Sequence, residues 1–599
     1  MPGLKTHPAA EGAREALSFM NEPVNISLTA CMRGRFARAF PEFADSAAAI
    51  RVEAASAPEF GDYQSNAAMA LAKKMKMPPR AIATKLIEKA CEAEGVARME
   101  IAGPGFINIF MDTAWLARKA EAAGRDATLG APQPGAGKCI CLDYSSPNVA
   151  KPMHIGHIRS TVIGNALDRI FRFLGYRVIA DNHLGDWGTQ FGILIMGYRH
   201  FLDPKAMEES PVEELERLYV KSYEKTQDQE WMEQCRRELV KLQDGDPDNT
   251  ALWEQFVTYS KEDFNRIYGR LGVRFDLVRG ESYYHRKLPG LVEALLQKKI
   301  IRESEGALVA LLDDGPDSAG AGKLPPAIVR KSDGAFNYLA TDIATALSRV
   351  EEFKPDKIIY VTDERQQLHF RQLFAVCSQL GLTTAMEHVW FGLMRLPQGT
   401  FSTREGNVIK LTKLLDEAET RALAVVREIN PGMPEAQQKE VARAVGIGAV
   451  KYADLSQNPQ SVVTFSWEKA LALNGNSAPY LQYTYARIRS VESKYAEQHP
   501  GSDYSSCEIR LHEPQERLLA FSIIRFAEIV PLAAQLSRPS VIADYLYQLA
   551  SAYNLFYQNV PFLKAPEGVR ESRVRLGSII ARILKQGLDL LGIDAPERI

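Results

Sequence analysis

The chain has 599 residues, of which 46% are hydrophobic and 24% are charged, a balance typical of a globular protein with roughly three or four domains. Its 72 basic and 74 acidic residues give a formal net charge of −2, so a nucleic-acid partner would have to bind a local basic patch. These values exclude the fibrous and disordered classes.

The first 20 residues contain no apolar stretch of signal-peptide length, and no uninterrupted apolar run elsewhere is long enough to span a bilayer. Seven scattered cysteines predict free thiols in a reducing compartment. Cys139 and Cys141 form a C-x-C pair without the neighbours of a zinc site, so two residues of a buried strand explain them better. We therefore expect a cytoplasmic protein with no membrane contact and no tightly bound metal, and we expect residues 1–20 to be a disordered leader.

Residues 21–125 form the first predicted unit. "NAAMALAKKM" and "RAIATKLIEKACEA" have helical spacing, and "GPGFINIFM" is typical of a strand bounded by glycines. We therefore predict an α+β N-terminal domain, followed by a Gly- and Pro-rich linker, "GAPQPGAGK", at 130–138.

Residues 135–411 alternate short apolar strands with helices, which predicts a Rossmann-like parallel-sheet domain. A charged, helix-periodic segment at about 203–270 is best explained as a helical insertion in this domain. The predicted strands are "CICLDY" at 139–144, "YRVIAD" at 176–181, "KIIYVTD" at 357–363 and "HVWFGL" at 388–393, with a helix at about 156–174.

From about residue 412 onward strand signals vanish and long amphipathic segments dominate. We predict a helical connection over 412–470 and an all-helical domain over 471–599. The fold class is thus a multidomain α/β protein.

The motif "SSPNVAKPMHIGHIRST" (145–161) follows the first strand of the predicted sheet and leads into a helix. Ligands of open α/β sheets bind at the carboxyl ends of strands, where helix N-termini offer free N–H groups to anions. His154 and His157 lie on the same side of one helical turn and can both donate to phosphate oxygens. Gly156 would let the backbone approach a nucleotide base. The pattern favours phosphate chemistry over a pair of merely structural histidines.

This stretch resembles the nucleotide-binding motif of class I aminoacyl-tRNA synthetases, in the form found in arginyl-tRNA synthetases. The likeness extends to "FGDYQSNAAMALAK" (60–73), "NHLGDWGTQFG" (182–192), "STREGNVIKLTKLLDEA" (402–418) and "NSAPYLQYTYARI" (476–488). It implies that L-arginine and ATP, the latter as its Mg²⁺ complex, form arginyl-adenylate. The arginyl group then passes to the 2′-hydroxyl of the terminal adenosine of tRNA(Arg). It also implies that activation depends on tRNA, and we expect a monomer.

The resemblance assigns roles to single residues of the nucleotide site. His154 and His157 would contact ATP and stabilise the transition state, Gly156 would make room for adenine, and Lys151 would meet the phosphates. The further ATP contacts that we predict are Gly185, Asp186 and Ser402.

Six residues resemble the family's arginine contacts. A carboxylate is the natural partner of a guanidinium group, and Asp342 follows Tyr338 by four residues, on one face of a helix. The α-amino and carboxylate contacts would be Asp143, Ser146 and Asn148, and the side-chain contacts Tyr338, Asp342 and Gln366. The choice between Gln366 and Gln367 stays open.

The second motif of class I synthetases, "KMSKS", corresponds here to "TFSTR". Thr400 and Thr403 stand where the two lysines would be, and Arg404 takes the place of the final serine. A cation must still neutralise the phosphates in the transition state. Lys151 and Arg404 are the two catalytic candidates, and the sequence leaves the choice between them open.

The resemblance also implies two tRNA-binding domains. Residues 471–599 would bind the anticodon, where Tyr480, Tyr483 and Tyr485 interleave with Arg487 and Arg489, and residues 21–125 would touch the tRNA elbow. Two alternatives stay open: another H-x-G-H enzyme, such as a cysteine-type or glutamate-type synthetase, and a catalytically silent tRNA-binding paralogue. The scattered cysteines argue against the cysteine type, and the intact motif residues argue against silence.

Overall fold

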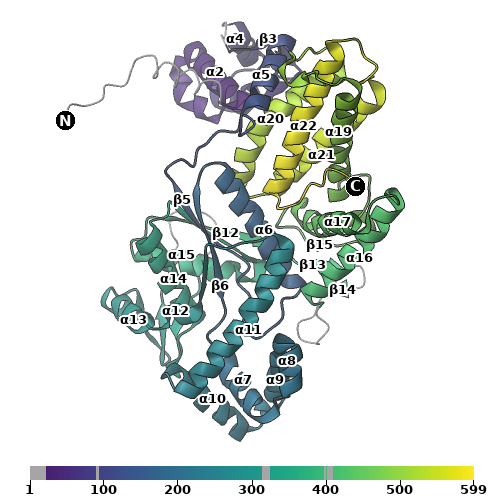
Figure 1. The fold of residues 1–599 in the computed structure, drawn as a ribbon. Coiled ribbons are helices and arrows are strands. Elements are labelled where there is room, and N and C mark those ends of the chain that lie inside the picture. Colours follow the sequence, from purple (N-terminus) through teal and green to yellow (C-terminus); the bar gives the residue numbers. More distant parts are fainter. Residues whose placement is uncertain (1–21, 89–92, 313–323, 397–398, 401–408) are drawn as a thin grey trace, which may run out of the picture.

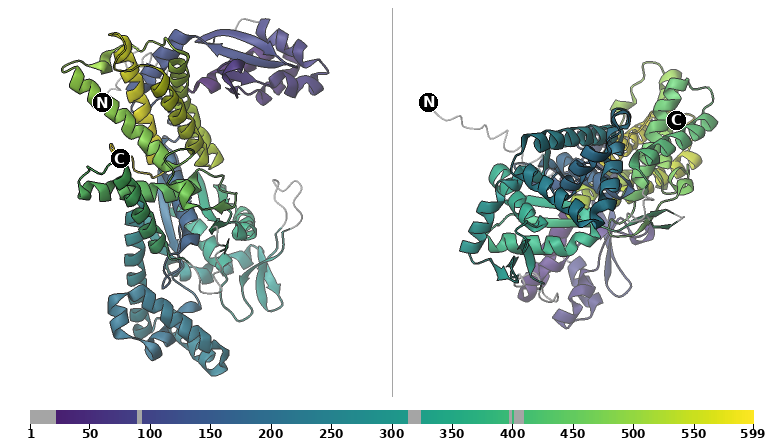
Figure 2. Two further views of the ribbon diagram at one scale, coloured as in Figure 1. Left: turned by 90° about the vertical axis from the view of Figure 1, so that its right-hand side faces the viewer. Right: turned by 90° about the horizontal axis from the view of Figure 1, so that it is seen from below.

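The computed structural model describes residues 22–88, 93–312, 324–396, 399–400 and 409–599. An N-terminal α+β domain, a central α/β domain and a C-terminal helical bundle follow one another along the chain (Figure 1). The N-terminal domain packs on the bundle and extends away from the α/β domain (Figure 2). The predicted fold class is confirmed.

The N-terminal domain is built on a four-stranded antiparallel sheet of order β1-β2-β4-β3. Its strands are β1 (Glu53–Ala54), β2 (Tyr63–Ser65), β3 (Val96–Ala102) and β4 (Phe106–Met111). Its helices are α2 (Val24–Ala39), α3 (Ala67–Met75), α4 (Pro79–Glu88) and α5 (Thr113–Arg125). The expected strand "GPGFINIFM" contains β4, which lies inside the sheet between β2 and β3. Its alternate residues Ile107, Ile109 and Met111 are buried.

Two buried carboxylates join this domain to the bundle. Asp62 accepts hydrogen bonds from both terminal nitrogens of Arg517 at 2.8 and 2.7 Å. Glu528 accepts from the Tyr63 hydroxyl at 2.7 Å and from the backbone N–H of Asn25 at 3.0 Å. Arg517 and Glu528 both belong to α20 (Pro514–Leu536) of the bundle, so this helix makes both contacts with the N-terminal domain.

The central domain contains a five-stranded, fully parallel sheet of order β12-β11-β5-β6-β7. Its strands are β5 (Cys139–Asp143), β6 (Arg177–Leu184), β7 (Leu277–Gly280), β11 (Lys357–Asp363) and β12 (Ala385–Phe391). The chain runs from β5 outward through β6 and β7, then returns to build β11 and β12 on the other side. The sheet therefore has its topological switch point between β5 and β11, where α/β proteins bind ligands.

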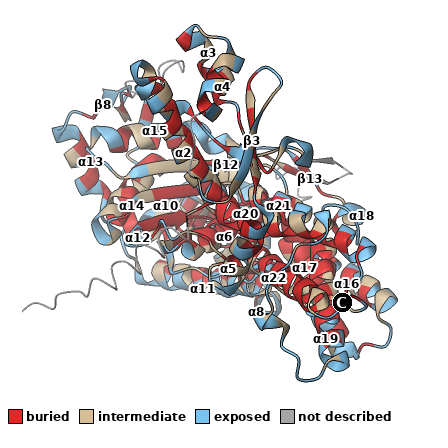
Figure 3. Cartoon of the chain, turned by 90° about the horizontal axis from the view of Figure 1, so that it is seen from above, coloured by how far each residue is buried: buried red, intermediate tan, exposed pale blue. Residues whose placement is uncertain are grey.

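Helices cover the faces of this sheet. They are α6 (Ile155–Phe173), α14 (Tyr338–Phe353) and α15 (Gln367–Gln379). Much of α6, α14 and α20 is coloured as buried in Figure 3. Helix α6 packs on the sheet and on the bundle at once.

The helical insertion expected at about 203–270 corresponds to α8 (Pro204–Glu209), α9 (Pro211–Glu224), α10 (Gln229–Gln243) and α11 (Pro247–Leu271), and a further helix, α7 (Gln190–Phe201), precedes it. These helices form the lower end of the molecule in Figure 1. A second excursion was not expected. It consists of α12 (Glu281–His285), α13 (Leu288–Gln297) and a three-stranded sheet of β8 (Ile301–Ser304), β9 (Ala307–Ala310) and β10 (Ala327–Arg330).

The C-terminal region is helical, with one exception. Its helices are α16 (Leu411–Ile429), α17 (Glu435–Leu455), α18 (Trp467–Ala470), α19 (Ala478–Gln498), α20, α21 (Ser540–Asn559) and α22 (Val569–Leu590). The exception is β15 (Val463–Thr464), which pairs with β13 (Met394–Leu396), itself paired with β14 (Gly399–Thr400). The expectation of no strand after residue 412 was wrong at this point, because a two-residue strand leaves no alternating pattern in the sequence.

Helix α20 is long and apolar enough to cross a membrane by length and composition, a property that the sequence analysis did not find. It is 67% buried over its most apolar window and packs against α5, α21 and α22. Its apolar side chains therefore serve as the core of the bundle.

Most cysteines behave as expected. Cys139 and Cys141 are buried in β5, and both are free. The other free thiols among the described residues are Cys235, Cys377 and Cys507. Cys31 is disulfide-bonded, so the expectation of free thiols was wrong for this residue.

A buried arginine connects α6 to the segments that follow the sheet. Arg159 and Asp454 form an ion pair at 2.9 Å with both side chains 1% exposed. Arg159 also donates to the backbone carbonyls of Gly392, Ser461 and Pro459 at 2.6, 3.1 and 3.2 Å. The helix that begins in the H-x-G-H motif is thereby fixed to α17 and to the loop after β12.

Candidate active site

A cavity of about 690 Å³ lies at the switch point, between the carboxyl ends of β5 and β11 and the first turns of α6 and α14. It is the place where the parallel-sheet rule puts a ligand. Ten of the residues expected from the sequence line it: Asp143, Ser146, Asn148, His154, Gly156, His157, Gly185, Tyr338, Asp342 and Gln366.

Two of the other expected site residues, Lys151 and Asp186, are described and do not line the cavity. Ser402 and Arg404 lie outside the described residues. Lys151 is exposed beside the cavity. The Asp186 carboxylate is buried and turns to the start of α12, where it accepts from the Ser282 backbone N–H at 2.9 Å and from the Ser282 hydroxyl at 2.7 Å. Asp186 therefore holds α12 rather than facing the cavity.

The two histidines cap α6 reciprocally. His154 is the N-cap residue, and its Nδ1 accepts from the Gly156 backbone N–H at 3.0 Å. The Nδ1 of His157 accepts from the His154 backbone N–H at 3.1 Å. Their ring centroids are 4.0 Å apart. A Cβ at Gly156 would lie 2.7 Å from the His154 ring, so packing against that imidazole requires glycine here.

These hydrogen bonds assign the tautomers of both histidines. Because each Nδ1 accepts a backbone N–H, each neutral ring carries its proton on Nε2. Burial lowers the pKa of His157 to about 3, with His154 and Lys151 adding to the effect. Burial and the nearby Lys151 also lower the pKa of His154. Both rings are therefore neutral N–H donors at physiological pH.

The turn between β5 and α6 is strained. Ser145, Ser146 and Ala150 have φ angles of 72°, 48° and 62°, a region that residues with a Cβ adopt at a cost of about 1–3 kcal/mol each. Specific bonds hold them there: the Ser145 backbone N–H donates to Ser160 Oγ at 2.9 Å, and that of Ser146 to Asn182 Oδ1 at 3.0 Å. Backbone strain gathered at one cavity rim is typical of functional sites.

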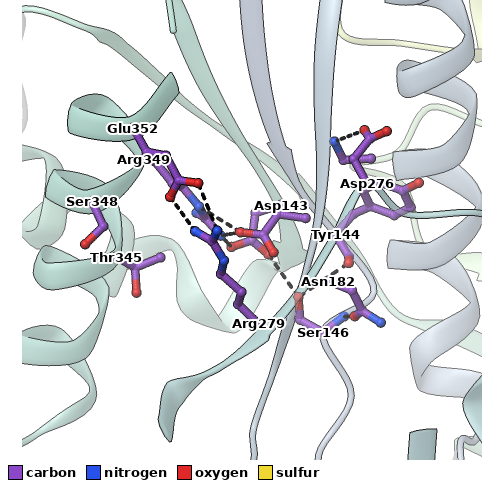
Figure 4. Close-up of polar contacts among 12 residues, drawn as sticks. Asp143, Tyr144, Ser146, Asn182, Asp276, Arg279, Thr345, Ser348, Arg349 and Glu352 are labelled. Atoms are coloured by element: carbon purple, nitrogen blue, oxygen red, sulfur yellow. Dashed lines mark hydrogen bonds and ion pairs between the residues drawn. The ribbon is translucent and has the colours of Figure 1, made fainter. Parts of the chain in front are cut away.

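A buried charge network underlies the same turn (Figure 4). Arg349 lies 2.6 Å from Asp143 and 2.8 Å from Asp181, and its side chain is 2% exposed. The other oxygen of Asp143 accepts from the Ser146 hydroxyl at 2.9 Å. Each Asp143 oxygen thus uses one lone pair within the protein, and Arg349 fixes the orientation of the carboxylate toward the cavity.

Asn148 and Gly185 bring the ends of two strands together. They form a parallel β-bridge, and the Val149 backbone N–H donates to the Gly185 carbonyl at 3.1 Å. A Cβ at Gly185 would lie 2.1 Å from Asn148 Oδ1. The glycine at the head of "GDWGTQ" is therefore required by the close approach of Asn148.

The residues expected to bind the arginine side chain line the same cavity from α14 and from the start of α15. Tyr338 and Asp342 occupy successive turns of α14, as their spacing predicted, and Tyr338 is 66% exposed. Asp342 Oδ2 lies 2.6 Å from His369 Nε2. Gln366 lines the cavity at the N-terminus of α15 and Gln367 does not, which favours Gln366 of the two.

Sequence reasoning missed Glu281, the first residue of α12. It lines the cavity, and burial, together with the nearby Asp342 and Asp186, raises its pKa to about 8. Its only sequence signal is its place directly after β7, at the carboxyl end of a parallel strand. That strand was itself not predicted, so the signal was lost.

The described residues contain no group of three or more His, Cys, Asp and Glu side chains arranged to hold a metal ion.

A parallel sheet with an H-x-G-H turn at its switch point, followed by a helical bundle, defines a class I aminoacyl-tRNA synthetase. Three family models agree. Residues 123–467 match the catalytic domain of class I tRNA synthetases (R), residues 481–599 match the DALR anticodon binding domain, and residues 27–111 match the arginyl tRNA synthetase N terminal domain.

Similar proteins point to the same family. An arginine–tRNA ligase of Fusobacterium nucleatum is 45% identical, over 91% of this chain and 94% of that protein. The arginyl-tRNA synthetase structure of Thermus thermophilus is similar with a TM-score of 0.78 and 27% identity, over 96% of this chain and all of that one. The Plasmodium falciparum arginyl-tRNA synthetase shares the fold, with a TM-score of 0.80 at 24% identity over 96% and 99% of the two chains. The chain belongs to the arginyl-tRNA synthetases.

His157 has two functions in this arrangement: its Nδ1 accepts the hydrogen bond of the cap, and its Nε2–H can donate to a phosphate. Two substitutions test these functions separately. His157→Asn keeps an acceptor near the position of Nδ1, so the cap should persist, but the Nε2–H donor is lost. We expect the thermal midpoint to stay near wild type and arginine-dependent ATP–pyrophosphate exchange to fall about 10²-fold, as for removal of one transition-state donor. In His157→Gln the amide reaches toward the Nε2 position instead, so the midpoint should fall and more exchange should remain. The reverse ranking in exchange would contradict the donor role.

Proposed function

We propose that this chain is an arginine–tRNA ligase. The carboxylate of L-arginine attacks the α-phosphorus of ATP, pyrophosphate leaves, and the resulting adenylate passes its arginyl group to the 2′-hydroxyl of the terminal adenosine of tRNA(Arg). One observation carries the proposal: a single cavity is lined by the two histidines of the α6 cap and by carboxylates that include Asp342 and Glu281. This combination of neutral N–H donors and acidic groups fits a triphosphate and a guanidinium group in the same pocket.

At the phosphate end we assign hydrogen bonding to His154 and His157. Their Nε2–H groups supply preorganised dipoles where negative charge grows on the five-coordinate phosphorus. Both rings are neutral, so they add no positive charge, and a cation must come from elsewhere. Magnesium enters with ATP as part of the substrate, and we assign the protein's cation to Lys151. Gly156 and Gly185 allow the nucleotide to approach the backbone.

At the arginine end Asp342 accepts the guanidinium fork, with Tyr338 and Gln366 beside it. A bidentate, charge-assisted pair rejects lysine and neutral side chains most strongly. Glu281 is the second carboxylate. With a pKa of about 8 it is largely protonated at neutral pH in the empty cavity, and an arriving cation favours its ionised form. Asp143, at the carboxyl end of β5, and Ser146 and Asn148, just after it, hold the α-amino and carboxylate groups of arginine.

The C-terminal domain binds the anticodon in this proposal. A second cavity, of about 1260 Å³, opens between α19, α21 and the chain end. The Arg487 guanidinium lies 4.9 Å from the Tyr483 ring centroid and 5.2 Å from that of Tyr557, and all three line the cavity. Stacked arginine and tyrosine suit unpaired bases. Tyr485 is 3% exposed and belongs to the core, so it is not an RNA contact in this proposal.

The remaining assignments follow the family. Residues 471–599 bind the anticodon, 412–470 connect them to the catalytic domain at 135–411, and 21–125 touch the tRNA elbow. We infer a monomer in the cytoplasm, with activation that requires tRNA.

Amino-acid selection and tRNA dependence are tested by one assay. ATP–pyrophosphate exchange with each of the twenty amino acids should respond to arginine alone, and only when tRNA(Arg) is present. Exchange with arginine in the absence of tRNA would contradict the tRNA requirement. Exchange with a different amino acid would contradict the proposed function.

The guanidinium site predicts the effect of Asp342→Asn. This change keeps size and shape but removes the charge, and loss of a charge-assisted pair should cost on the order of 2–4 kcal/mol in kcat/KM for arginine. The KM for ATP should stay within about twofold. Arginine kinetics within about threefold of wild type, well under 1 kcal/mol, would show that Asp342 is not the guanidinium partner.

The missing lysine motif predicts a large effect of Lys151→Ala. Removing an interaction specific to the transition state should lower adenylate formation about 10²-fold or more, mainly in kcat. Arg404→Ala is the matched comparison in single-turnover adenylate synthesis with tRNA present. A near-normal rate for Lys151→Ala with a collapsed rate for Arg404→Ala would transfer the role to the loop arginine.

A further inference from the structure

Lys151 has an unusual partner for an exposed lysine. Its ammonium nitrogen lies 4.8 Å from the centroid of the Tyr219 ring. Among the described residues no carboxylate forms an ion pair with Lys151. The ring belongs to α9 in the helical insertion, some 70 residues away along the chain. A helix of the insertion, outside the catalytic sheet, thus contacts the side chain of Lys151, just before the H-x-G-H motif.

Helix α9 is fixed relative to that motif by a second contact. Glu213 forms an ion pair with Lys410 at 2.7 Å. The backbone of Lys410 forms an antiparallel bridge with His154, and the flanking bonds are Ile155 N–H to the Ile409 carbonyl at 3.1 Å and Leu411 N–H to the Met153 carbonyl at 2.9 Å. The same helix therefore holds the segment that pairs with His154, and the Tyr219 ring has a defined position beside the motif.

The inner face of α9 supports this position. Val212, Leu215 and Leu218 are buried, and Tyr219 is half-buried next to them. Tyr219 also stacks on Tyr223, with ring centroids 5.9 Å apart and an angle of 22° between the rings. The ring that contacts Lys151 is consequently part of the packed insertion and not a free surface side chain.

A tyrosine face has a property that a carboxylate lacks. Lysine carries a compact charge on a long flexible stem, so a fixed partner is needed to hold its ammonium in one place. A carboxylate would do so at the cost of neutralising the charge, whereas the ring quadrupole attracts the ammonium and leaves its full charge for another ligand. That charge does reach the motif, because Lys151 contributes to the lowered pKa values of His154 and His157.

We propose that Tyr219 is a positioning residue for the reaction: its ring holds the Lys151 ammonium beside the phosphate end of the cavity without neutralising it. This inference rests on the proposed role of Lys151 in adenylate formation. It assigns to the helical insertion a part in activation, through the contact of one ring with one cation.

The test compares three variants in ATP–pyrophosphate exchange with arginine and tRNA. Tyr219→Leu removes the ring and should lower kcat about fivefold to twentyfold, with the KM for arginine within twofold. Tyr219→Phe keeps the ring face and should stay within twofold of wild type. Val220→Ala is the matched control on the same helix, since this neighbouring side chain is exposed and has no ring that could hold a cation, and it should also stay within twofold.

A double variant separates positioning from a general structural role. In a Lys151→Ala background Tyr219→Leu should cause no further fall, because the ring then has nothing to hold. Equal losses in both backgrounds, or a fall for Val220→Ala as large as that for Tyr219→Leu, would show that the ring only supports the fold and would overturn the inference. A faster Tyr219→Leu enzyme would overturn it too, because the ring would then withhold the lysine.

The outcomes also distinguish this inference from the role on which it rests. A near-normal Lys151→Ala enzyme would refute the catalytic role of Lys151 and the inference with it. A Lys151→Ala enzyme about 100-fold slower than wild type, beside an unaffected Tyr219→Leu enzyme, would refute the inference alone.

Discussion

The active-site helix depends on one buried guanidinium. Arg159 uses its N–H groups on the Asp454 carboxylate and on three backbone carbonyls, so the five donors of the side chain are all engaged. Removing one partner of such a pair typically costs about 3–5 kcal/mol, because the other charge stays buried and unpaired. Since Arg159 lies little more than one turn beyond His154, its contacts set how α6 enters the cavity, and the reciprocal histidine cap is built on that position.

A second buried arginine, Arg349, fixes α14 in a similar way. Arg349 connects α14, which carries Tyr338 and Asp342, to the ends of β5 and β6 through Asp143 and Asp181. The helix that carries Tyr338 and Asp342 is therefore connected to the strand ends by a buried ion-pair network. Strain in the turn at Ser145, Ser146 and Ala150 is sustained because the structures on both sides of it are fixed in this way.

Much of this arrangement was predictable from the sequence. Strands β5, β6, β11 and β12 each left an apolar run between turn residues, and the motif residues of α6 and α14 were identified from spacing and resemblance. The missed features share a cause. Strand β7 has four residues and β15 has two, too few for a period, so Glu281 and the pairing of β13 went unseen.

Other misses concern side-chain direction, which no local pattern encodes. Asp186 follows Gly185 in a stretch that suits a ligand-facing turn, yet its carboxylate is claimed by Ser282, nearly a hundred residues later in the chain. Tyr485 belongs to the same series of tyrosines as Tyr483, but it is buried in the bundle. Residues two apart on a helix face different sides. Only the tertiary structure shows that Ser282 is the partner of Asp186 and that the side of α19 on which Tyr485 lies is buried.

Charge is distributed along the cavity in a way that follows from these contacts. Burial and the nearby Asp342 raise the pKa of Glu281, while the two histidines are neutral and donate through Nε2. The carboxylates favour a cationic side chain, and the neutral rings offer a triphosphate dipoles without positive charge. The two arginines that line the cavity, Arg159 and Arg365, are each paired with a carboxylate, Asp454 and Asp363, whereas Lys151 beside the cavity lies over the uncharged ring of Tyr219. Holding that cation apart from any carboxylate keeps its charge available for the phosphates, which is the condition that a site without the usual lysine motif has to meet.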